Sequence, residues 1–548
     1  RLAGRRPLGV RPALREALRG VPAPPGTASA RGAAAVLGLG AAAYLGLHAL
    51  AAGHVPPGVA ADSVIEALRG LRLVLLRRFE VITVSIGPSA ETLWLYVTGA
   101  SVAALGPTRT SFLVPSILAA TTTLVLVAAL VRRIRPELPI YIALLVPASS
   151  LWLFHSGEVG LRASAAPLVL LGACFLLDDR MQRDVADRPF AAGALLGLGI
   201  YAYSACRLLP IAWVLHFALR WRRTPSARPA LGREARLLIL AFALVSIPNL
   251  LFLLRAPGLL LERGYYVSRG TPLDKLLNVL ATFLLPFVYP DRYRVWIGPG
   301  HVFDVTGVAL TASGVDPFDV AAGPLAVLGL LAWKRGKESA ALSFLLVAWA
   351  AGSVLLGLYG PSLTRLLVLL PAWLVFAALG CDALLSRAPR LKVPLATLLV
   401  LSMCLQARAW VSTFGRSEPA AWYFHEAATA MAERARDLTR GGRRVIVVSR
   451  SGRDVFKYFC WQRIEQVFHT AIPQGKPRPE DVPLAGFAAD VVLVERTPAL
   501  DAWGATLGTP SRSTLPSLFA EYERPHAKDA PPPTVRSNLW RLWSPMAL

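Results

Sequence analysis

Asp62 is the strongest candidate for a catalytic group, because it follows the first long apolar segment of the chain by about nine residues. From Ser63 onward the sequence has the period of an amphipathic helix, with arginines on its polar face. Its apolar stripe consists of Val64, Ile65, Leu68, Leu71, Leu75 and Leu76. Asp62 suits the N-cap of this helix, and it also suits a general base that deprotonates a hydroxyl group at a membrane surface. Glu66 lies one turn further on and can share the face of Asp62.

Arginines form a second group of candidates, because a guanidinium group binds phosphate oxygens through paired hydrogen bonds. They are Arg162, Arg207, Arg269 and Arg365. Tyr201 and Tyr203 precede Arg207 in GLGIYAYSACRLLP (197–210), and Glu91 begins ETLWLYVTGASVAAL (91–105). With Glu66, these residues are the candidate substrate-binding set. Any single arginine can instead reach for lipid headgroups, so the interpretation requires that they gather on one side of a membrane.

The composition indicates a polytopic membrane protein. Of 548 residues, 54% are hydrophobic and 17% are charged, whereas soluble domains carry about 25% charged residues. Apolar segments long enough or nearly long enough to cross a bilayer lie at 32–53, 110–131, 138–156, 159–177, 189–206, 208–219, 237–254, 320–333, 340–359, 366–381 and 393–407. The expected fold class is mainly α, a membrane helical bundle of about 11 spans with a small C-terminal α/β domain.

The orientation of the chain in the membrane follows from the lysine and arginine bias of its loops. Whether segment 91–105 crosses the membrane decides on which side the later loops lie. Its 15 residues, with Glu91 at the start and Gly106-Pro107 after the end, favour a helix lying on the outer surface. Segments 1–31, 132–137, 178–188, 220–236, 334–338 and 382–392 then face inside and hold 25 lysine and arginine residues among 81. The outside segments hold 14 among 134. We therefore expect a bacterial inner (plasma) membrane protein with its N-terminus inside and its C-terminal domain outside.

This topology places Asp62, segment 155–162, Arg207 and segments 262–270 and 360–365 at the outer face. Charged residues near membrane depth cost a few kcal/mol each and usually mark a site. Because cations outnumber acids in this set, a lipid-linked phosphate would neutralise it.

Other sites and partners find little support. The net charge of +24 is assigned to inside loops that face anionic lipids, so nucleic acid is not an expected partner. The five cysteines form neither a disulfide framework nor a CxxC site, and His155 and His301 are too far apart in sequence to read as a metal pair. No cofactor is certain, and a divalent metal stays compatible with the sequence. No cleavable signal peptide is expected, since the first apolar segment is long enough to remain as an anchor.

Three regions are expected. Residues 1–31 form a basic cytoplasmic N-terminus, and 32–410 form the membrane domain with outer loops 54–109 and 255–319. The second loop is amphipathic and then aromatic, which suits a cover over a lipid or sugar cleft. Residues 411–548 form an extracytoplasmic α/β domain, with strands at RRVIVVSR and ADVVLVE and helices before and between them. No glycine-rich nucleotide-binding fingerprint follows either strand.

The order of short motifs resembles the GT-C membrane glycosyltransferases of the protein mannosyltransferase and aminoarabinose transferase type. The motifs are PPGVAADS, ETLWLYVTGASVAALGP, LVPSILAATTTLVLVAALVRR, GLR, GLGIYAYSACRLLP and LTRLLVLLPAWLVFAALG, and the resemblance covers roughly residues 33–410. In this sequence Ser63 stands where the family usually has Glu. Leu113 and Ser362 stand at positions that often hold Arg and His, and Ser156-Gly157-Glu158 replaces a Ser-Arg step.

The resemblance implies transfer of a sugar from a polyprenyl-phosphate carrier to a protein, lipid or glycan acceptor at the outer face. Asp62 matches the family's catalytic acid, Arg207 would face the carrier phosphate, and Tyr201 and Tyr203 would line the cleft. Two alternatives stay open. A transporter or flippase for a lipid-linked sugar predicts charged or discontinuous helices at mid-membrane, which the sequence does not suggest. The other is a catalytically inactive relative that binds polyprenyl lipid.

Overall fold

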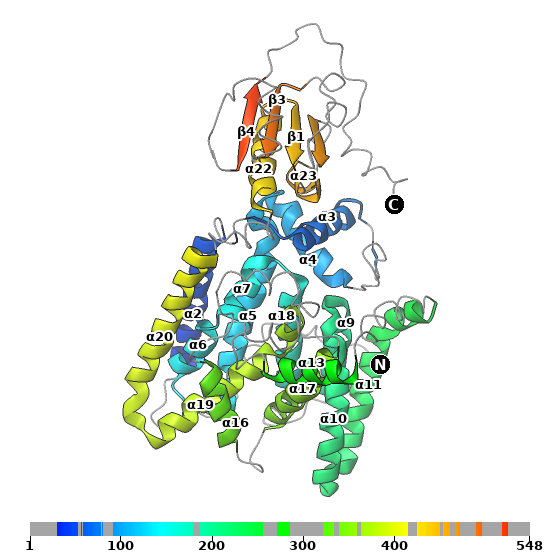
Figure 1. Ribbon diagram of the computed structural model, residues 1–548. Helices are drawn as coiled ribbons and strands as arrows, with labels where there is room; N and C mark the ends of the chain where they lie inside the picture. The colour runs from blue at the N-terminus through cyan, green and yellow to red at the C-terminus, as the bar shows by residue number, and fades with distance from the viewer. Residues whose placement is uncertain are drawn as a thin grey trace.

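The protein is a bundle of helices with a small sheet at one end, as the computed structural model shows (Figure 1). The structure describes residues 30–52, 56, 58–77, 79–80, 91–178, 187–255, 271–284, 322–333, 339–358, 363–414, 425–449, 453–460, 466–471, 489–495 and 518–523. Arg269, His301, Ser362 and most of the outer loop 255–319 lie outside these residues.

Each of the 11 predicted apolar segments falls on a helix or a helix pair. The bundle helices are α2 (Ala30–Ala51), α5 (Arg109–Ile134), α6 (Ile140–Ala148), α7 (Leu151–Val159), α8 (Ala166–Leu177), α9 (Asp187–Ala202), α10 (Leu208–Arg223), α11 (Arg228–Arg255), α16 (Ala322–Ala332), α17 (Ala340–Gly357), α19 (Leu370–Arg387) and α20 (Lys392–Arg408). Six described helices are long and apolar enough to cross a membrane, or seven if the bent pair α6–α7 counts as one span. The chain is an integral membrane protein.

The apolar helices α6 and α7 form a bent pair, with an angle of 57° at the break formed by Ser149 and Ser150. Pro147 near the end of α6 has no backbone N–H to continue the helix, and the Ser150 side chain caps α7 by accepting from the Leu153 N–H at 3.3 Å. The expectation that no helix is discontinuous was therefore wrong. A prolyl ring next to two serines supplies both the break and the new cap.

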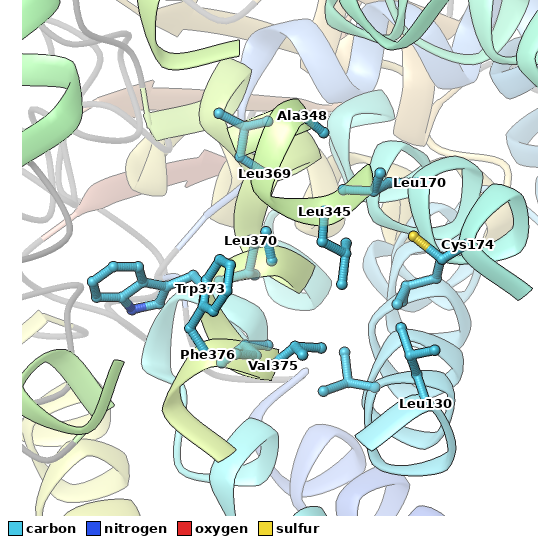
Figure 2. Close-up of a cluster of buried hydrophobic side chains, with 14 of the residues drawn as sticks. Leu130, Leu170, Cys174, Leu345, Ala348, Leu369, Leu370, Trp373, Val375 and Phe376 are labelled. Atoms are coloured by element: carbon cyan, nitrogen blue, oxygen red, sulfur yellow. The ribbon is translucent and has the colours of Figure 1, made fainter. Parts of the chain in front are cut away.

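The bundle packs around α19, which is buried along most of its length. Figure 2 shows side chains of α19 meeting those of α5, α8 and α17; the labelled ones are Leu130, Leu170, Cys174, Leu345, Ala348, Leu369, Leu370, Trp373, Val375 and Phe376. Gly329 of α16 faces α19 so closely that a Cβ there would lie 1.9 Å from the Phe376 carbonyl oxygen. Small residues at such crossings let helices in a membrane approach backbone to backbone.

Several segments predicted for the inside meet at the bundle end away from the sheet. Arg135 pairs with Asp382 at 3.2 Å and Arg133 with Asp178 at 3.9 Å, so segment 132–137 lies beside Asp178 and Asp382. The 26 residues of α5 span about 39 Å, and its other end touches the sheet-bearing part. The assignment of the arginine-rich end to the cytoplasm stays a prediction.

Two short helices, α3 (Ala61–Leu75) and α4 (Thr92–Leu105), lie between the bundle and the sheet (Figure 1). With 14 residues, α4 is about 21 Å long, which is less than the roughly 30 Å of a bilayer's hydrocarbon core. It packs along α3 instead of crossing the bundle, and it ends at Gly106, whose φ of 79° favours glycine. Segment 91–105 therefore forms a short helix at the end of the bundle that carries the sheet.

The C-terminal part is the expected α/β unit. It contains α22 (Glu426–Arg440), β1 (Val445–Ser449), α23 (Arg453–Phe459), β2 (Val467–Ala471), β3 (Val491–Glu495) and β4 (Phe519–Glu523). The strand order is β2-β1-β3-β4, parallel except for β4, and β1 and β3 are the two strands predicted from sequence. Both are wholly buried, as continuous apolar strands of parallel sheets are.

This unit is docked on α3 and on the start of α5. Helix α23 packs on α3, and one apolar core joins side chains of both. The Tyr458 hydroxyl donates to the Thr108 carbonyl oxygen at 2.8 Å and lies 2.7 Å from the Ser111 hydroxyl. Thr108 and Ser111 form the capping box of α5. Val59 lies three residues before Asp62, and its N–H donates to the Thr429 hydroxyl of α22 at 3.3 Å. The sheet unit thus touches the segment that leads to Asp62.

Candidate active site at the sheet-bearing end of the bundle

Arg162 joins two buried carboxylates from different segments. It begins the short helix η1 (Arg162–Ala165), and its side chain is 28% exposed. Its Nη1 donates to Glu66 of α3, and its Nε pairs with Glu91, which precedes α4. Glu66 and Glu91 are 2% and 3% exposed. Three candidate residues from distant parts of the chain therefore meet in one network.

Glu91 also binds the hairpin that carries the tyrosines. Its Oε1 accepts the Ser204 N–H at 2.6 Å, and Ser204 begins η3 (Ser204–Arg207). Tyr203, just before η3, is buried and interacts electrostatically with Arg162. Glu91 and Ser204 are 113 residues apart in the chain. The Glu91 carboxylate thus holds η1 and η3 together.

Asp62 is exposed and lies one helical turn before Glu66. The residue at the N-cap is Ala60, and Asp62 is in the first turn, so the expectation that Asp62 caps the helix was wrong. The next residue, Ser63, donates from its hydroxyl to the Val159 carbonyl oxygen at 2.8 Å. This bond fixes the start of α3 against the end of α7 and leaves the Asp62 carboxylate directed away from the core, accessible to a substrate.

Burial raises the pKa of Glu66 to about 7, from an ordinary value of 4.5. Arg162 opposes this increase in the pKa of Glu66, while the charges of Glu91 and Asp62 add to it. Glu66 is therefore divided between its neutral and charged forms near neutral pH. The expected excess of cations is not found in this network, where one guanidinium group faces two carboxylates and Asp62 lies nearby.

The other predicted arginines are placed as follows. Arg207 ends η3 and is half-buried, three residues from Ser204. Arg365 is exposed in α18 (Leu363–Leu366), which leads into η5 (Leu367–Leu369), and η5 contacts η1. Arg207 and Arg365 therefore lie in segments that adjoin the network. Arg269 lies outside the described residues.

Tyr201 has a different setting from Tyr203. Its hydroxyl donates to the Val245 carbonyl oxygen at 2.9 Å and accepts the Asn249 N–H at 3.2 Å. Val245 and Asn249 are four residues apart in α11, next to Pro248. The Tyr201 hydroxyl thus bonds to two backbone groups one helical turn apart in α11. Both hydrogen bonds are to backbone, so we leave Tyr201 out of the substrate-binding set proposed below.

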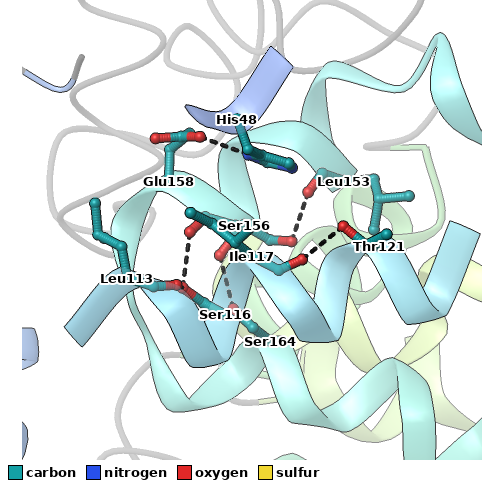
Figure 3. Close-up of polar contacts among 10 residues, drawn as sticks. His48, Leu113, Ser116, Ile117, Thr121, Leu153, Ser156, Glu158 and Ser164 are labelled. Carbon is teal, nitrogen blue, oxygen red and sulfur yellow. Dashed lines mark hydrogen bonds and ion pairs between the residues drawn. The ribbon is translucent and has the colours of Figure 1, made fainter. Parts of the chain in front are cut away.

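Sequence reasoning missed a buried ionisable pair in the bundle. His48 of α2 and Glu158 of α7 are both 0% exposed, with the His48 Nδ1 2.5 Å from the Glu158 Oε1 (Figure 3). The His48 ring stacks on Phe154 at 4.3 Å. Gly157 makes room for it, since a Cβ there would lie 2.6 Å from the His48 ring. A histidine and a glutamate inside apolar segments were the available signal.

Arg109, the first residue of α5, links this pair to the sheet unit. It interacts electrostatically with Glu158 and with Glu426 and Glu433 of α22. Because Arg109 lies between acids of both parts, its charge favours the docked arrangement.

A metal site is not evident among the residues that the structure describes, where no three histidine, cysteine or acidic side chains are grouped to bind an ion. His155 instead meets the Trp410 ring edge to face at 4.8 Å.

No family model matches the sequence, and no curated protein matches it. Solved structures do match. ArnT from Cupriavidus metallidurans bound to undecaprenyl phosphate aligns with 90% of this chain and 99% of its own, at 11% identity and a TM-score of 0.51. The apo form of the same protein covers 89% and 98% at 12% identity, with a TM-score of 0.51. The apo oligosaccharyltransferase from Archaeoglobus fulgidus covers 84% and 69% at 15% identity, with a TM-score of 0.49. The chain therefore has the GT-C fold of the aminoarabinose transferase type that its sequence motifs predict.

Proposed function

We propose that the protein is a membrane glycosyltransferase that moves a sugar from a polyprenyl-phosphate carrier to an acceptor at the outer membrane face. The observation that carries this proposal is the exposed Asp62 carboxylate one turn from the Glu66–Arg162–Glu91 network. The network lies at the bundle end that the sheet unit covers. Support comes from the fold, which is shared over 90% of the chain with a protein solved with undecaprenyl phosphate.

Asp62 is the general base in this proposal. Its carboxylate takes the proton of an acceptor hydroxyl while the acceptor oxygen bonds to the anomeric carbon of the sugar. The bond from that carbon to the phosphate oxygen breaks, and the electron pair leaves with the carrier phosphate. A single base acting opposite the leaving group inverts the anomeric configuration. A positioned base contributes about 100- to 10,000-fold to the rate of such a step.

Arginines stabilise the leaving phosphate. Arg207, Arg365 and Arg162 come from segments that adjoin one another, and cations placed in advance lower the cost of the charge that develops on the phosphate. Arg269 belongs to the proposed set on sequence grounds. Tyr203 is buried, interacts electrostatically with Arg162 and belongs to the proposed substrate-binding set.

Glu66 and Glu91 support the site through Arg162. Glu91 ties η3 to η1, so the segments that carry Arg162 and Arg207 are held in one arrangement, and ionised Glu66 ties α3 to η1 before the donor binds. Groups held in this way need little reorganisation during the reaction.

The test is transfer by the purified protein in liposomes. Labelled polyprenyl-phosphate hexoses and pentoses are supplied with protein, lipid and glycan fractions of the cell envelope as acceptors. We expect label in one acceptor fraction with inverted anomeric configuration. Carrier binding without transfer to any acceptor would identify an inactive relative, and a retained configuration would contradict the single-base mechanism.

One observation favours a flippase as a second candidate. The bent helix pair α6–α7 and the buried His48–Glu158 pair are features of helices that carry polar substrates across membranes. Proteoliposomes with a fluorescent polyprenyl-phosphate sugar distinguish the two. Movement of the lipid between leaflets without sugar transfer supports the flippase, and transfer without movement supports the transferase.

A further inference from the structure

The two carboxylates on Arg162 are anchored differently. Glu91 uses one oxygen for Arg162 and the other for the Ser204 N–H at 2.6 Å. Glu66 uses Oε1 for Arg162, while its buried Oε2 has no hydrogen-bond partner among the described residues. A buried oxygen without a partner costs free energy, and the cost is greatest when the group is charged. An ionised Glu66 is therefore costly to bury, which favours its protonated form.

Burial favours the uptake of a proton by Glu66, the charge of Arg162 opposes it, and the charges of Glu91 and Asp62 add to the effect of burial. Arg162 of η1 is the cation in contact with it, and Glu91 and Asp62 are the anions that act on it. Arg162 itself interacts with Glu66, Glu91, Asp62 and Tyr203. An ionised Glu66 occupies the Nη1 edge of the guanidinium group, which would otherwise be able to donate to a phosphate oxygen.

We propose that Glu66 is a proton-operated clamp on Arg162: the ionised carboxylate holds the guanidinium group, and protonation releases its Nη1 edge to the phosphate of the lipid-linked donor. The proton comes from solvent and stays on the Glu66 carboxyl group while the donor is bound. Glu66 is thus a positioning residue that acts through Arg162. This inference rests on the proposed function, because it takes the donor phosphate as the anion that Arg162 receives.

The direction of the pH dependence follows from the pKa of Glu66. That pKa is about 7, so the clamp is mostly closed at pH 8 and mostly open at pH 6. Donor affinity should increase about tenfold as the pH falls from 8 to 6, because the protonated fraction rises by that factor. A polyprenyl-phosphoryl hexose is a phosphodiester whose charge is constant over this range, which removes the ligand's own titration.

The experiment measures binding of a short-chain polyprenyl-phosphoryl hexose to the full-length protein at pH 6 and pH 8. We expect about tenfold tighter binding at pH 6 for the wild type, and the tighter affinity at both pH values for Glu66→Gln. Glu433→Gln is the matched control, since burial also raises the pKa of Glu433 on α22. It should keep the tenfold ratio. Equal affinity of the wild type at both pH values overturns the clamp.

A second measurement needs no variant. If the donor binds only the protonated form, its binding at pH 7.5 takes up most of one proton per ligand and at pH 6 almost none. Calorimetry in buffers of different ionisation enthalpy measures this uptake. No uptake at pH 7.5 overturns the clamp and leaves the proposed function intact, whereas no binding at either pH overturns both. The same pH-dependent uptake with phosphatidylglycerol would assign the anion to a membrane lipid and overturn the role in donor binding.

Discussion

Gly70 of α3 and Gly99 of α4 touch backbone to backbone where the two helices cross. A Cβ on Gly99 would lie 2.1 Å from the carbonyl carbon of Gly70, and one on Gly70 would lie 2.0 Å from the Leu95 carbonyl oxygen. This crossing sets the distance between the helix that carries Asp62 and the helix that follows Glu91. The site geometry therefore depends on two residues without side chains.

Gly70→Ala should separate α3 from α4 and lower both stability and activity. Backbone atoms cannot yield as a flexible side chain can, so we expect a cost of at least about 1–3 kcal/mol. Gly38→Ala on α2 is the control, because nothing lies within 4 Å of a Cβ there. Alanine is a better helix former than glycine, and this variant should be neutral or slightly more stable in thermal unfolding. Equal melting temperatures for both variants would refute the close crossing.

Tyr458→Phe should weaken the docking of the sheet unit. The substitution removes the hydroxyl that bonds to Thr108 and Ser111 at the start of α5. Loss of buried hydrogen bonds of this kind costs about 1–3 kcal/mol. Limited proteolysis should cut the chain between α20 and α22 faster than in the wild type. Tyr141→Phe serves as control because Tyr141 is 41% exposed on α6. Cleavage at the wild-type rate in both variants would mean that the Tyr458 hydroxyl does not stabilise the docking of the sheet unit.

The His48–Glu158 pair should show strong coupling in a double-mutant cycle. Removing one partner leaves the other buried polar group without its hydrogen bond, which costs about 1–3 kcal/mol, whereas replacing both with apolar side chains can be nearly neutral. We expect His48→Phe and Glu158→Leu to lower the melting temperature markedly, and the double variant to recover much of the loss. Additive losses in the double variant would mean that the pair does not interact as described.

The sidedness of the bundle can be measured with single cysteines. Asp437 on α22 and Thr224 at the turn between α10 and α11 are both exposed and lie at opposite ends of the bundle. In a Cys404→Ser background, a membrane-impermeant maleimide should label Asp437→Cys in intact cells. It should label Thr224→Cys only after lysis. The reverse pattern would place the sheet unit and Asp62 in the cytoplasm.

Much of the fold could be predicted because it depends on local patterns. Each long apolar run became helix, since a backbone in lipid must satisfy its hydrogen bonds internally, whereas the two sides that the charge bias assigns to the loops stay a prediction. Segment 91–105 was placed beside the bundle because it is too short to cross it. The break between α6 and α7 was missed, because Pro147 alone does not distinguish a kinked helix from a broken one.

The contacts of the site could be predicted less well from the sequence, since they join distant segments. Glu91 meets Ser204 over 113 residues and His48 meets Glu158 over 110, and no local pattern specifies such pairs. The charges of Glu66, Glu91 and Arg162 were visible, but not that they neutralise one another. Tyr201 and Tyr203 look equivalent in sequence, yet the hydroxyl of Tyr201 is bonded to the backbone of α11 at Val245 and Asn249.

The role of Asp62 as the base is tested most directly by single-turnover sugar transfer in wild type and Asp62→Asn, with donor binding measured in the same samples. Asp437→Asn is the control, since Asp437 is an exposed aspartate on α22. At pH 6, where Glu66 is mostly protonated in both proteins, we predict that Asp62→Asn binds the donor as the wild type does and transfers sugar about 100- to 10,000-fold more slowly. Transfer by Asp62→Asn at the wild-type rate would contradict the assignment of Asp62 as the base.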